Sequence, residues 1–476
     1  MGMRPKIGLE VHAQLLTDSK MFCGCSTRFG ETANSQCCPV CSGVPGTLPV
    51  ANRKAVELVI RTGLALGCEV AERCRFARKN YFYPDMPKNY QISQYEEPLT
   101  YDGRIDVDVD GDTHRIRIRR VHLEEDTGKN FHLPDGTSLV EYNRAGTPLM
   151  EIVTEPDFSS AEQVRAYLTS LREIVRYIGV ASGNMEEGAM RCEPTVNIVD
   201  DETGERTECV EIKNLASIRG VYEAVKYEVR RQRRAVEDGE PIRQETRRWS
   251  EEKQETQLMR TKESAGDYMY FPDPDLLPMV PAAEWDIDKI RQSLPELPDA
   301  LRARFMNDYG LPEYDAGVLT ASKAMADYFE EVVGLCNDAK AASNWVMGDL
   351  SRMLNSAGLG IEASPVSPAG IAELLGLVQA GKITGKIAKD VFETMFETGQ
   401  AAATIVESGG LEVVGGEDEL GPIIDQVIAE NAAAVADYRE GKKKAKGALV
   451  GGVMKLTKGQ ADPQQVNRLI DEKLLS

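Results

Sequence analysis

Ionisable side chains stand in this sequence at positions where a β-strand normally carries a core residue. Glu10 and His12 are two residues apart in a strand-like segment, so both side chains leave the same face. Glu151 lies among apolar neighbours, between Leu149 and Val153. The full set of such residues is Glu10, His12, Glu124, Glu125, Glu151, Glu211 and Lys213.

Several carboxylates that converge in a protein interior need a cation, because a buried carboxylate without a partner is costly. Carboxylate oxygens with one imidazole suit Mg²⁺, which keeps several waters and binds phosphate groups. The set therefore predicts a Mg²⁺ site that supports phosphoryl transfer. The alternative is that some of these side chains face solvent on edge strands.

A phosphate-binding P-loop is missing from the sequence. The nearest match runs from Gly376 to Ile383, and it ends in isoleucine where a serine or threonine should contact Mg²⁺. It also follows a helical pattern instead of a strand. If this chain transfers phosphate, it does so without a P-loop.

Five of the ten cysteines fall between Cys23 and Cys41. Cys23 and Cys25 form one close pair and Cys38 and Cys41 another, a pattern that suits four thiolates around a structural Zn²⁺. Cys37 is an alternative to Cys38, although it leaves a less usual gap to Cys41. The competing interpretation is a set of ordinary buried, reduced cysteines.

Residues 78–91 concentrate aromatic side chains, cations and prolines. Tyrosine and proline provide a rigid surface, and Lys79 and Lys88 are candidates to bind phosphate. Lys79, Tyr81 and Lys88 are therefore the expected cofactor-binding residues. The alternative is a packing loop with solvated lysines.

The composition is that of a globular enzyme with more than one domain. The chain has 476 residues, 42% hydrophobic and 28% charged. No stretch approaches the roughly 18 apolar residues that cross a bilayer, and the start lacks a secretory apolar region. We expect a cytoplasmic protein without membrane contact.

The formal net charge of −20 argues against a protein that coats nucleic acid, because phosphate binding needs clustered cations. From Asn431 to Ser476, however, nine Lys or Arg face five Asp or Glu. This basic C-terminal segment is where we expect RNA to bind.

Hydrophobic periodicity predicts an α+β fold built on a largely antiparallel sheet. Strands are expected at 6–15, 104–110, 114–124, 139–143, 149–154, 193–199 and 208–213, a helix at 52–67, and long helices at 160–178 and 220–238.

The sequence changes character twice along its length. Residues 1–293 show both strand and helix patterns, whereas 294–406 have a helical period with little strand signal. Residues 407–421 are rich in glycine and acidic residues. We expect a sheet domain, an all-helical domain at 294–406 and a small helical tail domain at 407–476, of which 407–421 is a linker.

The sequence contains a series of distinctive motifs from one end to the other. They are Ile7–His12, Cys38–Cys41 with Pro45–Pro49, Lys79–Asp85, Glu124–Lys129, Tyr142–Glu151, Glu211–Leu215, Glu245–Arg247, Phe271–Leu276 and Val453–Gly459. In these motifs and in their order, the sequence resembles the B subunits of tRNA-dependent amidotransferases almost end to end.

The resemblance implies a carbon–nitrogen ligase with a cradle domain, a helical domain and a tail that grips tRNA. ATP would phosphorylate the side-chain carboxylate of Glu-tRNA(Gln) or Asp-tRNA(Asn), and ammonia would displace the phosphate. A glutaminase of the amidase type would supply the ammonia as a partner subunit, and a small third subunit would complete a heterotrimer.

The resemblance also assigns residues to the site. It places Mg²⁺ on Glu10, His12, Glu125 and Glu151, with Glu124, Glu211 and Lys213 as further site residues, and Zn²⁺ on the four cysteines. The sequence departs from the family where Glu193 and Thr195 replace the usual aspartate and asparagine, so the roles of these two residues stay open.

Two other functions are compatible with parts of the sequence. A non-catalytic tRNA-binding scaffold would use the cysteine cluster and the basic tail, but it has no need of the acidic set. A free-standing ATP-dependent ligase would need its own ammonia source, and no cysteine or serine lies in a convincing glutaminase triad.

Overall fold

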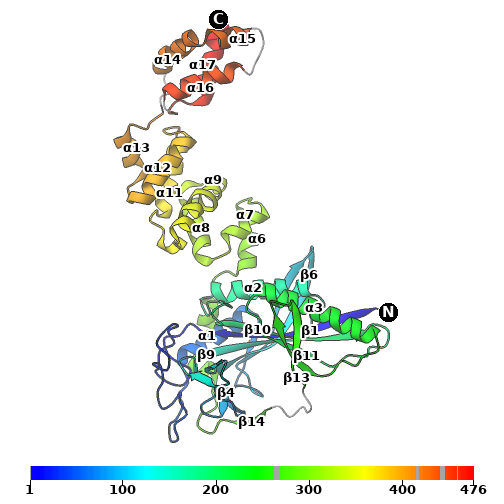
Figure 1. Ribbon diagram of the computed structural model, residues 1–476. Helices are drawn as coiled ribbons and strands as arrows, with labels where there is room; N and C mark the ends of the chain where they lie inside the picture. The colour runs from blue at the N-terminus through cyan, green and yellow to red at the C-terminus, as the bar shows by residue number, and fades with distance from the viewer. Residues whose placement is uncertain (1, 262–267, 414–416, 440–444, 458, 476) are drawn as a thin grey trace. The chain divides into compact units, whose positions relative to one another are not determined.

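The computed structural model describes residues 2–261, 268–413, 417–439, 445–457 and 459–475. They divide into two compact units, Met1–Pro298 and Asp299–Ser476. The first unit combines a large, mostly antiparallel sheet with helices, and the second is helical (Figure 1). The predicted α+β class with a helical C-terminal part is confirmed. The division of the helical part into two domains stays a prediction.

A nine-stranded sheet forms the centre of the first unit, in the order β13-β12-β11-β10-β1-β9-β6-β5-β2. All neighbours are antiparallel except β11 and β12, which are parallel. The strands are β1 Met3–Gln14, β2 Glu69–Val70, β5 Thr100–Val109, β6 Asp112–Glu125, β9 Pro148–Thr154, β10 Met190–Asp200, β11 Val210–Lys213, β12 Glu245–Ser250 and β13 Glu255–Thr261.

Helices cover one face of this sheet. They are α1 Arg53–Ala65, α2 Ala161–Tyr177 and α3 Ile218–Glu237. Ser160 and Ser217 cap α2 and α3 by accepting backbone N–H bonds, the usual role of serine at this position. Alternate residues of β1, including Leu9 and Val11, are buried in the core on the helical side. The polar residues between them, Glu10 and His12, therefore leave the opposite face.

A second sheet, of three antiparallel strands in the order β14-β3-β4, belongs to the same unit. In Figure 1, α2 and α3 lie above the large sheet, whereas β4 and β14 lie below it. The remaining elements of this unit are a hairpin and two short helices. The bounds are β3 Ala77–Asn80, β4 Tyr90–Ser93, β14 Met269–Pro272, β7 Lys129–His132, β8 Ser138–Glu141, α4 Pro281–Glu284 and α5 Ile287–Gln292.

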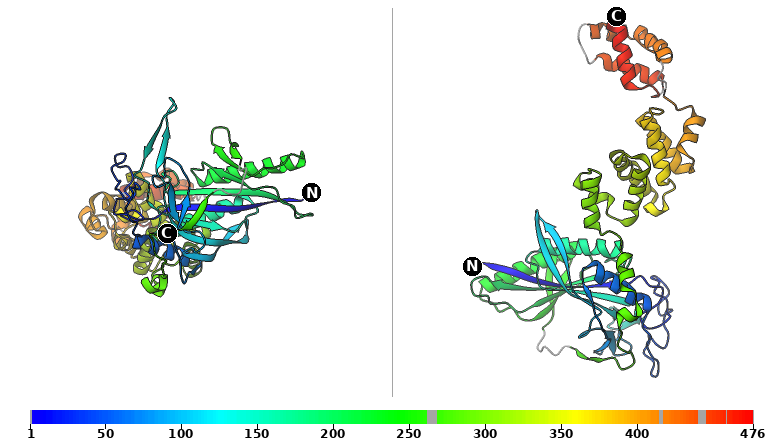
Figure 2. Two further views of the ribbon diagram at one scale, coloured as in Figure 1. Left: turned by 90° about the horizontal axis from the view of Figure 1, so that it is seen from below. Right: turned by 180° about the vertical axis from the view of Figure 1, so that it is seen from behind.

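The hairpin of β5 and β6 turns at Asp110–Gly111, where both residues have positive φ (53° and 91°) as a two-residue hairpin turn requires. Figure 2 shows this hairpin extending beyond the rest of the sheet. Further along β6, the pairing with β9 shifts between Ile118 and Arg120. Such a bulge moves the following side chains to the other face.

The second unit consists of helices. They are α6 Pro298–Asp308, α7 Glu313–Leu319, α8 Lys323–Cys336, α9 Ala339–Trp345, α10 Ser351–Ala357, α11 Pro368–Gln379, α12 Gly385–Thr398, α13 Ala402–Gly409, α14 Glu417–Glu430, α15 Ala432–Arg439, α16 Lys446–Leu456 and α17 Pro463–Leu475, with a π-helical turn at Val346–Leu350 and a 3₁₀ turn at Ile361–Ala363. Both ends of the predicted linker 407–421 are helical. Among the described residues, no helix is long and apolar enough to cross a membrane.

The C-terminal helices have a hydrophobic cluster of their own, which includes Leu420, Leu449, Val466 and Ile470. The basic segment expected to bind RNA lies in this part of the chain. Residues 440–444, which hold three of its lysines, and Lys458 lie outside the described residues.

A buried carboxylate ties α3 to the edge of the large sheet. Glu228 is fully buried and accepts two hydrogen bonds from Arg231, at 2.6 and 3.0 Å, and one from Thr256 on β13, at 2.8 Å. Burial alone would raise the pKa of Glu228, but the hydrogen bonds and charge of Arg231 outweigh it and lower the pKa.

We expect Glu228→Gln to lower the free energy of unfolding by about 3 kcal/mol, because it leaves Arg231 without its anion. The pKa of Glu228 is lowered in the folded state. Its contribution to the free energy of unfolding is therefore present above the ordinary pKa of 4.5 and is lost as the pH falls below that value. Urea unfolding at pH 7 and pH 3 checks both points. Glu237→Gln, at the exposed end of α3, is the control; an equal loss in both variants, or a loss independent of pH, contradicts the assignment.

Candidate active site

A row of ionisable side chains crosses three neighbouring strands of the large sheet. His12 on β1 and His122 on β6 are both register partners of Glu151 on β9. The Glu151 carboxylate lies 3.6 Å from Nε2 of His12 and 3.2 Å from Nε2 of His122. Glu124, two residues beyond His122 on the same face, lies 3.4 Å from Nε2 of His12.

His12, Glu124 and Glu151 each offer one ligand atom, and these atoms all lie within 4.8 Å of one another. Glu124 and Glu151 are both buried. One nitrogen and two carboxylate oxygens at this spacing match the hard donor set that Mg²⁺ takes, with room for water and phosphate. The residues therefore fit a divalent cation.

A second group of charged side chains lies on the same face of the large sheet and extends across β10 and β11. Glu10 is the register partner of Glu193, and Thr195 is the partner of Glu211. The ammonium of Lys213 lies 2.6 Å from Glu193 and 3.0 Å from Glu211. Glu193, whose role the sequence left open, is thus an ion-pair partner of Lys213.

The small sheet forms the opposite wall. Tyr270, Lys79 and Gln91 are register partners across β14, β3 and β4 and face the large sheet together with Tyr81. A cavity of about 660 Å³ lies between the two walls, and Glu10, His12, Lys79, Tyr81, Glu124, Glu151, Glu193, Thr195, Glu211 and Lys213 all line it.

Electrostatics in the cavity favour a cation. Burial and the neighbouring Glu151 raise the pKa of Glu10 to about 7, and burial raises the pKa of Glu124. Although burial opposes it, the charge of Glu151 raises the pKa of His12 to about 9. For Glu151 the two histidines outweigh burial and lower the pKa. The positively charged side chains of the cavity therefore offset the charge of its carboxylates only in part, and a bound cation would offset more of it.

Glu125 and Lys88 do not line this cavity, and their expected roles in binding Mg²⁺ and the cofactor stay predictions. Consecutive strand residues point to opposite faces, so Glu125 points away from the side of Glu124. It forms an ion pair with Lys88 and accepts a hydrogen bond from the backbone N–H of Ile92 at 3.0 Å. Glu125 and Lys88 line a separate cavity of about 200 Å³ beside Cys41.

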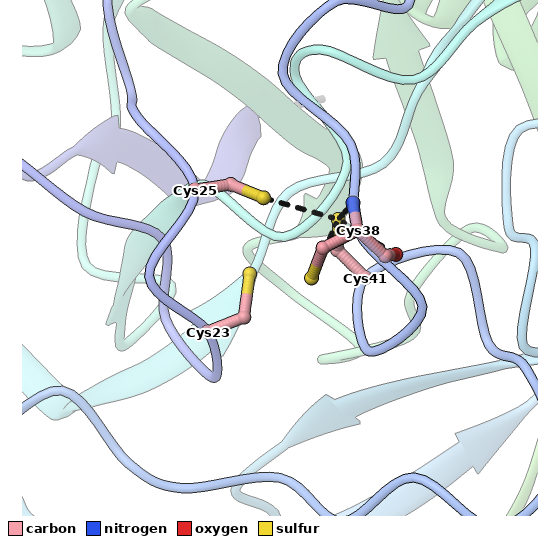
Figure 3. A group of neighbouring side chains, drawn as sticks. All are labelled: Cys23, Cys25, Cys38 and Cys41. Atoms are coloured by element: carbon pink, nitrogen blue, oxygen red, sulfur yellow. Dashed lines mark hydrogen bonds between the residues drawn. The ribbon is translucent and has the colours of Figure 1, made fainter.

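The four cysteines expected to bind zinc come together. Their sulfur atoms lie within 4.8 Å of one another, with Cys41 at 4.0 Å from Cys25 and 3.9 Å from Cys38. Figure 3 shows the four thiols pointing toward a common centre. Tetrahedral Zn²⁺ with bonds of about 2.3 Å needs sulfurs roughly 3.8 Å apart. The residues therefore fit Zn²⁺, and Cys37 is not one of the four.

Two neighbours of the Cys41 thiol, Cys23 and Lys20, lower its pKa. The Lys20 side chain is fully buried, and its ammonium lies 3.6 Å from the Cys41 sulfur. A hydrogen bond from Cys23 and this positive charge lower the pKa of Cys41. A lowered pKa favours the thiolate, which is the form that binds a metal.

Sequence reasoning missed several residues of the cavity. His122, which is almost completely buried, contacts Glu151, and its spacing of two from Glu124 was the available signal. Asp126 is buried and pairs with Arg191 at 2.7 Å. Tyr95, Arg120 and Tyr270 were not singled out either, because nothing in the sequence ties these three residues to the acidic set.

The fold and the cavity define an α+β protein with a candidate divalent-cation site between two sheets and a four-cysteine site nearby. Residues 5–286 match the family model described as the GatB/GatE catalytic domain, and residues 327–474 match the GatB domain. The chain belongs to this family.

Curated relatives match over nearly the whole chain. A protein of Thermoanaerobacter sp. (strain X514), named as the B subunit of aspartyl/glutamyl-tRNA(Asn/Gln) amidotransferase, is 52% identical over 468 residues, which is 98% of each chain. A protein of the same name from Trichlorobacter lovleyi is 51% identical over 474 residues and covers both chains completely.

Proposed function

We propose that this chain is the activating and amidating subunit of a tRNA-dependent amidotransferase. It phosphorylates the side-chain carboxylate of Glu-tRNA(Gln), Asp-tRNA(Asn) or both with ATP, and then transfers ammonia to the activated carbonyl. Family membership supports the reaction class. The observation that carries the mechanism is the convergence of His12, Glu124 and Glu151 in a cavity that also holds two lysines.

A carboxylate is a poor acyl donor, because its leaving group would be oxide. Mg²⁺ held by His12, Glu124 and Glu151 would neutralise phosphate charge and orient the nucleotide. His122 holds the Glu151 carboxylate from the other side, which fixes its direction.

The lysines of the cavity have complementary roles in this proposal. Lys79 carries its charge near Glu124 and Glu151, which raise its pKa although burial opposes this. A permanently charged ammonium at this place suits the transferred phosphate. Lys213, held between Glu193 and Glu211, offsets one of their two negative charges beside Glu10.

An acyl phosphate hydrolyses readily, so the cavity must exclude water while it admits ammonia. We propose that a glutaminase partner of the amidase type supplies the ammonia and that a small third subunit completes a cytoplasmic heterotrimer. Within this chain, residues 1–293 carry the chemistry, and 294–406 and 407–476 form two helical domains, of which the last binds tRNA through its basic residues. Zn²⁺ on the four cysteines has a structural role, because four protein ligands close its coordination shell.

Co-purification with partners and an amidation assay on both mischarged tRNAs test the proposal. We expect an amidase-like partner to co-purify and Gln-tRNA or Asn-tRNA to form only when ATP, Mg²⁺ and glutamine are present. Ammonium chloride should replace glutamine, because it bypasses the glutaminase. Amidation without ATP, or by the partner proteins alone, would contradict the proposal and favour a non-catalytic scaffold.

A further inference from the structure

An aromatic pair occupies the rim of the cavity beside the candidate cation site. The rings of Tyr95, which follows β4, and Tyr270 on β14 are stacked, with centroids 4.3 Å apart and planes 14° apart. Both residues line the cavity, and Tyr95 is 47% exposed. A stacked pair with one ring open to solvent is unusual for residues whose only role is packing, because burial of the ring is what stabilises a core aromatic.

Arg120 lies next to this pair. It is on β6, two residues before His122, and its guanidinium lies 5.6 Å from the centroid of the Tyr95 ring. Its contact with the protein is weak: one hydrogen bond of 3.4 Å to the backbone oxygen of Tyr95. Within the described part of the chain, its buried Nε has no hydrogen-bond partner and no carboxylate pairs with the guanidinium.

Nucleotide binding would explain both the stacked tyrosine pair and the arginine beside it. An aromatic side chain provides a stacking surface for a base, typically worth about 1–3 kcal/mol. An arginine without an anion stacks on planar groups and binds phosphate through several N–H donors. The stacking surface and the arginine lie in the same cavity as the cation site, where phosphate groups would bind.

We propose that Tyr95, Tyr270 and Arg120 form an adenosine-binding subsite of the cavity. The adenine ring stacks on the tyrosine pair, and Arg120, held by a single long hydrogen bond, turns onto the base or its phosphate. The inference rests on the proposed function, since both of its substrates carry adenosine: ATP, and the aminoacyl-tRNA at its 3′-terminal nucleotide. ATP and the tRNA terminus would both present an adenine ring and a phosphate to the subsite.

Steady-state kinetics of the assembled heterotrimer test the subsite and identify the source. ATP is varied at saturating mischarged tRNA, and the tRNA is varied at saturating ATP, with the wild type, Tyr95→Ala, Tyr95→Phe and Arg120→Gln. Tyr314→Ala, at a tyrosine that is 78% exposed in the helical unit, is the matched control. Thermal unfolding verifies that each variant is folded.

We expect Tyr95→Ala to raise the KM of one substrate about tenfold and to leave kcat nearly unchanged, because only binding is affected. A raised KM for ATP places the nucleotide in the subsite, whereas a raised KM for tRNA places the terminal adenosine there. Tyr95→Phe keeps the ring and should behave like the wild type, and Arg120→Gln should raise the same KM as Tyr95→Ala.

Three results would overturn the subsite. These are unchanged KM values for both substrates, equal effects of phenylalanine and alanine at Tyr95, and a general loss in which both KM values rise and kcat falls. A wild-type heterotrimer that shows no ATP-dependent amidation would instead reject the proposed function, so the two failures are distinguishable.

Discussion

Glu151→Gln is expected to lower kcat for ATP-dependent amidation at least a hundredfold. Glu151 contacts both His12 and His122, and its carboxylate oxygen is one of three ligand atoms of the candidate cation site. Glutamine keeps the size of the side chain but removes the charge that attracts Mg²⁺. A hundredfold loss corresponds to about 2.7 kcal/mol of transition-state stabilisation.

Glu155→Gln is the matched control for this prediction. Glu155 directly follows β9 and pairs with Arg119 at 2.8 Å, outside the cavity. It should retain nearly full activity, and glutamine hydrolysis by the partner should persist in both variants. Amidation by Glu151→Gln at more than a tenth of the wild-type rate, at any Mg²⁺ concentration, would exclude Glu151 as a ligand.

The second large effect is expected at the four-cysteine site. Cys41→Ala should reduce bound zinc from about one equivalent to almost none, because Cys41 contributes one of the four converging sulfurs. Since structural zinc couples its binding energy to folding, thermal stability should fall with the metal content. Metal analysis of the purified protein and a thermal scan with and without a chelator measure both quantities.

Cys37→Ala provides a control one residue away from the site. Cys37 is partly exposed and does not belong to the four-cysteine group. Zinc content and stability should therefore match the wild type. If Cys41→Ala retains its zinc, or if Cys37→Ala loses as much as Cys41→Ala, the four-thiolate assignment is wrong.

The central strands and helices were predictable because their burial follows a simple period. On β1, Leu9 and Val11 alternate with Glu10 and His12, and the structure places the apolar pair in the core. The strands β2, β3, β4, β7, β12, β13 and β14 were not predicted. Most of them are short, and the register that joins distant segments such as 77–80 and 269–272 has no local signal.

The sequence could not show whether Glu124 or Glu125 joins His12 and Glu151 at the candidate cation site. On β6, Ile116 and Ile118 face the core, but after the register shift at Arg120 the buried apolar residues are Val121 and Leu123. The bulge therefore brings Glu124, and not Glu125, to the cavity. Alternation continued from Ile116 would place Glu125 there, and nothing in the sequence marks the bulge.

We propose above all that the carboxylate of the tRNA-bound amino acid is phosphorylated in the cavity of His12, Glu124 and Glu151. The most direct test labels that side-chain carboxylate with ¹⁸O and follows the inorganic phosphate released during amidation by the heterotrimer. We predict one ¹⁸O atom in each phosphate for the wild type and almost no labelled phosphate for Glu151→Gln. Unlabelled phosphate from the wild type, or full transfer by the variant, would contradict the account.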